Sequence, residues 1–128
     1  MILTIDTSSD EVVVGLLDNN LQTERQVRKN LPARQSDDLL GLITEHLQNE
    51  KISFSQLKMI AVNPGPGSFT GIRVGLTTAN FLAFSLNIPI TDSDGEKMKA
   101  KTKKIQFIKP VLPVYDRLPH ITFPKSGL

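Results

Sequence analysis

The 128 residues contain no cysteine and no tryptophan, and only 5% of them are aromatic. Without cysteine the chain cannot form a disulfide scaffold or a thiolate metal site, which is typical of a protein from a reducing compartment. No apolar run approaches the roughly 20 residues of a membrane-spanning helix, and the N-terminus lacks the basic start of a signal peptide. We therefore expect a cytoplasmic protein with no membrane partner.

Strong charge of either sign is also missing. A net charge of +2 is too small to predict a nucleic-acid surface by itself. The length suits one domain with a core and is short for two. The composition changes after residue 91, so we expect an N-terminal lobe at 1–91, a lysine-rich linker at 92–104, and a C-terminal strand with an extended, proline-rich tail at 105–128.

The N-terminal lobe alternates between strand and helix signals. Two short β-branched runs separated by a polar turn predict a hairpin, and the mainly polar stretch after it predicts a third strand at an exposed edge. Apolar residues at helical spacing then predict two helices separated by a further strand. We expect strands at 1–7, 11–17, 21–29, 58–62 and 87–91, a first helix at 33–48, and a second that follows Ser68 and reaches Leu86. This order predicts an α/β fold of the ribonuclease H-like type, a five-stranded mixed sheet with the first strand near its centre, as in one lobe of an actin-like ATPase.

Glycine is concentrated in residues 63–75, which read Asn-Pro-Gly-Pro-Gly-Ser-Phe-Thr-Gly-Ile-Arg-Val-Gly. Backbone amides at a helix N-terminus can bind phosphate, but the segment lacks the lysine of a P-loop and the spacing of a dinucleotide fingerprint. A tight turn into a helix capped by Ser68 is the favoured interpretation. The residues assigned to this structural turn are Gly65, Gly67, Ser68, Thr70, Gly71 and Arg73.

The second helix is apolar around most of its circumference, and Arg73 is its only charged residue. One stripe is made of small residues, which would allow another helix to approach closely. A lobe of this size has little to cover the outer apolar surface, so we expect a partner to bind there, with coverage by the tail as the alternative. The expected interface residues are Leu40, Ile43, Leu47, Gly71, Gly75, Thr78, Leu82 and Ser85.

Other candidate chemistry is sparse. Asp6, Thr7 and Ser8 could face a metal-bound phosphate, although a polar turn explains the same residues. His46 and His120 have no second ligand at metal spacing, so we expect no metal site. The lysines of residues 97–104 could contact RNA phosphates, but a solvated linker is the favoured interpretation.

Two stretches resemble a known family. The N-terminal run Met-Ile-Leu-Thr-Ile-Asp-Thr-Ser and the glycine segment 63–75 are similar to those of TsaB (YeaZ), a bacterial tRNA threonylcarbamoyladenosine biosynthesis family. The resemblance extends over residues 1–91 and resumes weakly at 112–119. Family members have two actin-like lobes, and here the lysine-rich linker stands in place of most of the second.

The resemblance implies a non-catalytic subunit. It predicts that the chain binds and supports the TsaD-type catalytic subunit, that a TsaE-type ATPase joins the complex, and that tRNA is the substrate of the assembly. No cofactor is expected on this chain alone, while ATP or ADP with magnesium could bind in the assembled complex. A homodimer of the isolated chain would be unsurprising.

Two alternatives come from other classes. The chain could be a nucleotide-binding, ATPase-like lobe that acts as a dimer and uses Asp6, Thr7 and the glycine turn. It could also be a protease, as has been discussed for some relatives, although the sequence supplies no nucleophile and base for that reaction.

Overall fold

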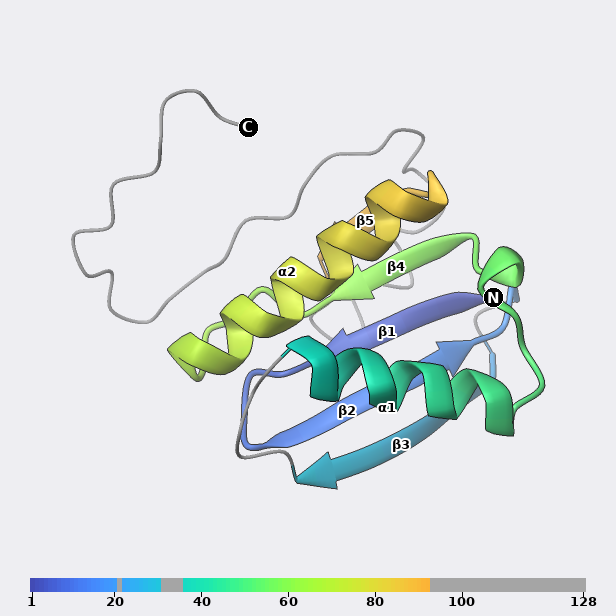
Figure 1. Ribbon diagram of the computed structural model, residues 1–128. Helices are drawn as coiled ribbons and strands as arrows, with labels where there is room; N and C mark the ends of the chain where they lie inside the picture. The colour runs from blue at the N-terminus through green and yellow to red at the C-terminus, as the bar shows by residue number, and fades with distance from the viewer. Residues whose placement is uncertain (21, 31–35, 93–128) are drawn as a thin grey trace.

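A computed structural model describes residues 1–20, 22–30 and 36–92 of the chain (Figure 1). The predictions for residues 93–128, which include most of the lysine-rich linker, the tail and His120, lie outside the described residues. Within the described part, no helix combines the length and the apolar character that crossing a membrane requires.

Five strands form one mixed sheet. They are β1 (Ile2–Asp6), β2 (Glu11–Leu17), β3 (Glu24–Asn30), β4 (Met59–Val62) and β5 (Ile90–Asp92). Their order is β3-β2-β1-β4-β5, in which β1 pairs antiparallel with β2 and parallel with β4. This confirms the predicted five-stranded mixed sheet with the first strand at its centre. β3 begins three residues later than predicted, and its mainly exposed side chains agree with an edge strand.

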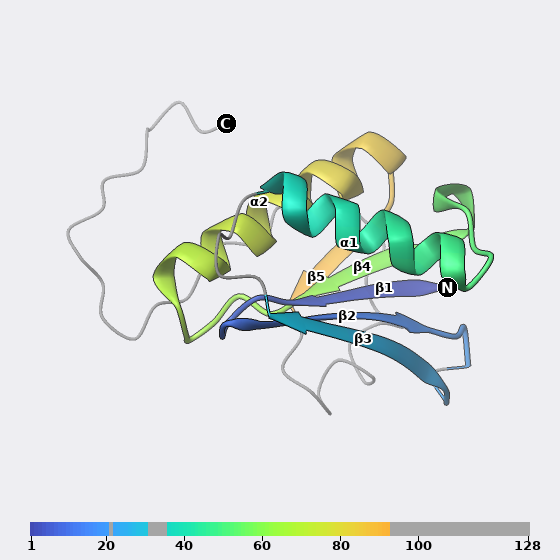
Figure 2. The same cartoon turned by 60° about the horizontal axis from the view of Figure 1, so that its bottom comes forward.

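Both α-helices cover the same face of the sheet (Figure 2). They are α1 (Ser36–Asn49) and α2 (Phe69–Leu86), with a short 3₁₀ helix, η1 (Phe54–Gln56), after α1. The predicted start of the first helix at residue 33 lies outside the described residues. α2 turns Ile72, Leu76 and Ala79 toward the sheet, where they are fully or almost fully buried, as the helical spacing predicted.

Each face of the sheet has its own apolar cluster, because successive residues of a strand point to opposite sides. Leu3 and Ile5 of β1 belong to the core cluster beneath the helices, which we call the helix face. Ile2 lies opposite Leu17 and Met59 in the two neighbouring strands. Those three residues form a separate cluster with Ala61, on what we call the far face.

Candidate functional site

The polar residues predicted near a nucleotide lie where the parallel strands β1 and β4 end. The chain leaves β1 through Thr7 and Ser8, and it leaves β4 through Asn63 into the glycine turn. The turn passes directly over the end of β1, because the Ser68 amide donates a hydrogen bond of 2.8 Å to the Ser8 carbonyl. Carboxyl ends of parallel strands are where α/β proteins commonly bind ligands, so this edge is a candidate site.

The side chains at this edge bind one another. The Asp6 carboxylate accepts hydrogen bonds from the Ser8 amide at 2.9 Å and from the Ser8 hydroxyl at 2.6 Å. The Asn63 amide side chain donates to the same hydroxyl at 3.4 Å and accepts from the Gly65 amide at 3.0 Å. These bonds are those of a polar turn that fixes two loops together. A nucleotide contact by Asp6, Thr7 and Ser8 stays a prediction.

Thr7 is the buried centre of this arrangement. Its hydroxyl donates a hydrogen bond of 2.6 Å to the Gly71 carbonyl in the first turn of α2. A Cβ placed on Gly75 would lie 2.1 Å from that hydroxyl oxygen, and one on Gly71 would lie 2.3 Å from the Thr7 carbonyl oxygen. The two glycines therefore let α2 approach the end of β1. The interpretation that they open a groove for another protein is wrong, because their own chain occupies that space.

The rest of the glycine turn is partly as predicted. Ser68 caps α2, since its side chain accepts a hydrogen bond of 3.3 Å from the Gly71 amide. A Cβ on Gly67 would lie 2.4 Å from the Ser8 carbonyl oxygen, so this glycine too allows close contact. Thr70 and Arg73 are exposed, and the Arg73 guanidinium lies 5.6 Å above the ring of Phe69. We find no role in the turn for these two side chains.

Most residues of the predicted partner interface are buried within the chain. The buried residues of this set are Ile43 and Leu47 of α1, and Gly71, Gly75, Thr78 and Leu82 of α2. Buried side chains cannot form a partner surface directly, so the structure corrects this part of the residue set. α1 and α2 also pack against each other.

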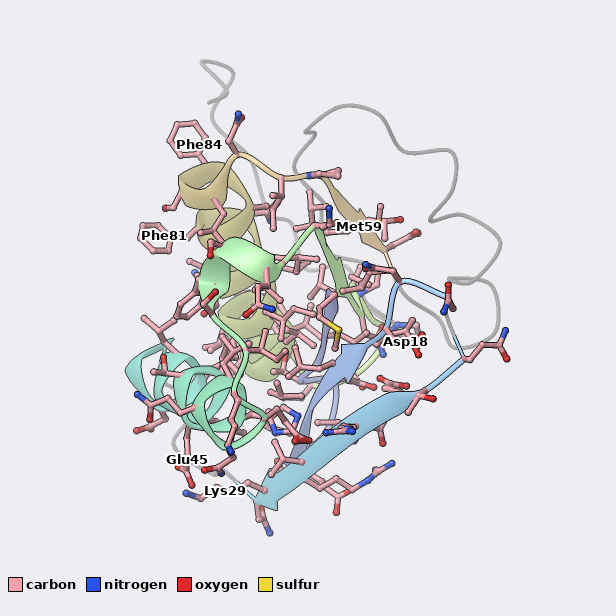
Figure 3. All side chains as sticks on the ribbon, turned by 90° about the vertical axis from the view of Figure 1, so that its right-hand side faces the viewer. Asp18, Lys29, Glu45, Met59, Phe81 and Phe84 are labelled. Carbon is pink, nitrogen blue, oxygen red and sulfur yellow. The ribbon has the colours of Figure 1, made fainter. Side chains whose placement is uncertain are left out.

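The exposed apolar residues of α2 lie beside that stripe. Phe84 is 80% exposed and Phe81 is 59% exposed, and both point away from the sheet (Figure 3). From the predicted interface set, Ser85 is also exposed and Leu40 is half-buried. Neither phenylalanine belongs to the sheet-facing side of α2, which includes Ile72, Leu76 and Ala79. Both phenylalanines were missed as interface residues because the small-residue stripe was taken as the outer surface.

Metal ligands do not assemble in the described part of the chain, where no group of three or more His, Asp or Glu side chains could hold an ion. His46 is buried in α1, and its Nε2 lies 2.8 Å from the backbone carbonyl oxygen of Arg25 in β3. His46 is thus packed between α1 and β3.

Comparison with known proteins gives one family model that matches most of the chain. The model described as TsaD, tRNA N6-adenosine threonylcarbamoyltransferase, matches residues 31–116. The tRNA threonylcarbamoyladenosine biosynthesis protein TsaB of a Buchnera aphidicola strain is 36% identical over 90 residues, which are 70% of this chain and 42% of that protein. TsaB of Bacillus subtilis is 34% identical over 93 residues, which are 70% of this chain and 39% of that protein. The chain thus spans about two fifths of these curated relatives.

Solved structures agree with the sequence matches. YeaZ from Pseudomonas aeruginosa superposes with a TM-score of 0.65 at 28% identity, over 73% of this chain and 44% of that chain. A protein described as uncharacterized with similarity to the peptidase YeaZ from Pseudomonas aeruginosa gives a TM-score of 0.66 at 25% identity. The superposition covers 80% of this chain and 48% of that chain. The five strands and two helices described above are therefore one lobe of this fold.

Proposed function

The chain belongs to the TsaD-like family of tRNA threonylcarbamoyladenosine proteins, and within it to the TsaB (YeaZ) group, and from this premise we propose that it is a non-catalytic subunit in the formation of that modified nucleoside. In this role it binds and supports a TsaD-type catalytic protein. The tRNA is the substrate of the assembly, a TsaE-type ATPase joins it, and ATP or ADP with magnesium binds in the assembled complex.

The observation that carries the proposal is the pair of exposed phenylalanines on α2. Phe81 and Phe84 are three positions apart, so they lie on the same side of the helix. Aromatic anchors at this spacing are typical of a helix that inserts into an apolar groove of a partner, and aromatic residues often dominate the binding energy of an interface. Together with Ser85 they form what we call the α2 outer surface.

A supporting role is also consistent with the hydrogen bonds at the carboxyl edge. The Thr7 hydroxyl donates to Gly71, and the Ser8 hydroxyl donates to Asp6. Both protons are thus committed to the fold. In this proposal the TsaD-type partner carries out the transfer of the threonylcarbamoyl group.

The test is co-purification with a TsaD-type protein from the same organism, using the variants Phe84→Asp and Phe81→Asp. Each should leave folding intact, because the side chain is exposed, and should reduce recovery of the partner at least about tenfold, because a buried unpaired charge is costly. Gln26→Asp on the exposed edge strand β3 is the matched control and should leave recovery unchanged. Full recovery with both phenylalanine variants would place the interface elsewhere.

Charged substitutions at Thr78 or Leu82 are unsuitable for this purpose. Both residues are buried in the chain, so a charge there would destabilise the fold itself. A loss of partner binding in such variants would report unfolding and would not identify a contact.

A second candidate function is nucleotide binding by the lobe, acting as a dimer. The observation in its favour is the position of Asp6, Ser8 and Asn63 at the carboxyl end of the parallel strands β1 and β4. Calorimetry with ATP and magnesium, on the chain alone and on its complex with the partner, separates the two proposals. Heat from the isolated chain, abolished by Asp6→Ala, would favour nucleotide binding. Heat from the complex alone would favour the subunit role.

A further inference from the structure

The far face of the sheet is buried, although the described helices lie on the other side. Ala61 is fully buried, and Leu17, Met59 and Ile2 are nearly so. Their side chains form a cluster that is separate from the core beneath α1 and α2. Thr91 of β5, which lies opposite Ala61, is buried as well. An apolar side chain on a sheet face is shielded from water only when something lies over it.

None of the described elements can supply that cover. α1 and α2 pack on the helix face (Figure 2), and the strands themselves run within the sheet. One side chain partly crosses the far face: the Glu24 carboxylate passes over Gly15 and accepts a hydrogen bond of 2.8 Å from the Thr4 hydroxyl. That carboxylate is polar, so it forms a rim of the apolar cluster and does not cover it.

We propose that the far face is the docking site of residues 105–115 of the same chain. This inference is independent of the proposed function. Among residues 93–128 this stretch is the richest in large apolar side chains, whereas the stretch 93–104 before it is charged and polar. The apolar side chains available to meet the far face are Ile105, Phe107, Ile108, Val111, Leu112, Val114 and Tyr115.

Chain length and the family match both agree with this occupant. β5 ends at Asp92, so twelve residues, 93–104, connect it to the proposed segment. Extended chain spans roughly 3.3 to 3.6 Å per residue, or about 40 Å here, which exceeds the length of about 23 Å of a seven-residue strand. The family model also continues past β5 as far as residue 116. The matched region thus includes the whole of the proposed segment.

The absence of cysteine allows a direct test, because any introduced thiol is the only one in the chain. Ala61→Cys places a thiol on the far face, and Ala79→Cys places one beneath α2 on the helix face. Both alanines are fully buried, so the two variants are matched. Phe84→Cys supplies an exposed thiol on α2. Each cysteine variant is made in the full chain in two forms. One has the native segment, and the other has a serine segment that combines Val111→Ser, Leu112→Ser and Val114→Ser. The rate of labelling by a maleimide is measured for both forms.

The expected result is selective. With the native segment, the thiols at 61 and 79 should react slowly and the thiol at 84 quickly. With the serine segment, labelling at 61 should accelerate about tenfold or more, because the far face opens to solvent, while labelling at 79 and 84 should not change. A matched replacement of three lysines by serine within residues 97–104 should alter none of the rates.

Other outcomes would overturn the proposal in distinguishable ways. Fast labelling at 61 with the native segment would show that the far face is open. Protection at 61 that persists with the serine segment and increases with protein concentration would identify a second copy as the occupant. Acceleration at 84 alone would place the segment on α2. If labelling at 79 also accelerates, the serine segment has unfolded the lobe, and the single variant Val114→Ser then decides between the same outcomes.

Discussion

Replacing Gly75 with alanine tests the closest approach in the lobe. Elsewhere in a helix this change is favourable, since alanine exceeds glycine in helix propensity by about 1 kcal/mol. At this position the new Cβ would lie 2.1 Å from the Thr7 Oγ1 and 3.2 Å from the Thr7 Cβ. Thr7 is β-branched and buried, so it has little freedom to move aside.

Two costs oppose the gain in propensity. Separating α2 from the end of β1 is an overpacking change, which usually costs about 1 to 3 kcal/mol. Rotating Thr7 instead breaks its buried hydrogen bond of 2.6 Å to the Gly71 carbonyl, which costs about 1 to 3 kcal/mol when a buried group is left without a partner. Only one of these costs arises at a time, so after the gain of about 1 kcal/mol is subtracted we expect Gly75→Ala to lower the free energy of unfolding by about 1 kcal/mol.

The assay is thermal unfolding followed by far-UV circular dichroism, because the chain has no tryptophan to report by fluorescence. A loss of about 1 kcal/mol should lower the Tm by about 4 °C. Gly41→Ala on α1 is the matched control, since an added Cβ there meets nothing within 4 Å, and it should stabilise the protein by about 1 kcal/mol. In a Thr7→Ala background the penalty of Gly75→Ala should largely disappear. If Gly75→Ala raises the Tm as Gly41→Ala does, the close contact between α2 and β1 is not real.

Three further predictions concern stability. Ser68→Ala removes the cap of α2 and should lower the free energy of unfolding, measured by urea titration, by about 1 kcal/mol. Ser68→Asp can still cap the helix and should retain most of the native stability. Equal losses in the two variants would argue against capping. The Thr78 hydroxyl is buried and has no hydrogen-bond partner among the described residues. Thr78→Val should therefore leave the Tm unchanged or raise it, and a clear fall would indicate a bond to a residue outside that part of the chain. The pKa of the Met1 amine lies below its ordinary value of 8.0 because burial disfavours its charged form and Lys58 repels it. The folded state therefore releases this proton at lower pH than the unfolded state does, and stability should rise slightly with pH through the window just below pH 8; a chain with an acetylated N-terminus should lack this rise.

Local patterns predicted the elements of the lobe well. The strand signals located all five strands, although Val27 is the one strong strand former in β3. Apolar spacing identified the sheet-facing side of α2. These signals depend on neighbours within a few residues. The cap at Ser68 was predictable for the same reason. Strand ends were less certain: β3 begins at Glu24, and nothing local in the preceding polar residues marks that start.

The candidate site was only partly predictable. The sequence placed Asp6, Thr7 and Ser8 in a turn after the first strand, but it could not show that the glycine turn closes over them. That contact joins residues 64 positions apart, Thr7 and Gly71. Likewise, the stripe with Thr78 and Leu82 was taken as a partner surface, whereas both residues are buried within the fold.

The sequence by itself determined the order of strands and helices, the capped turn into α2, and the presence of an apolar surface on that helix. Only the tertiary structure decided which side of α2 meets which neighbour. The physical reason is that Gly71 and Gly75 indicate a close approach without identifying the element that approaches. The fold supplies the end of β1 at that place, and it leaves Phe81 and Phe84 exposed.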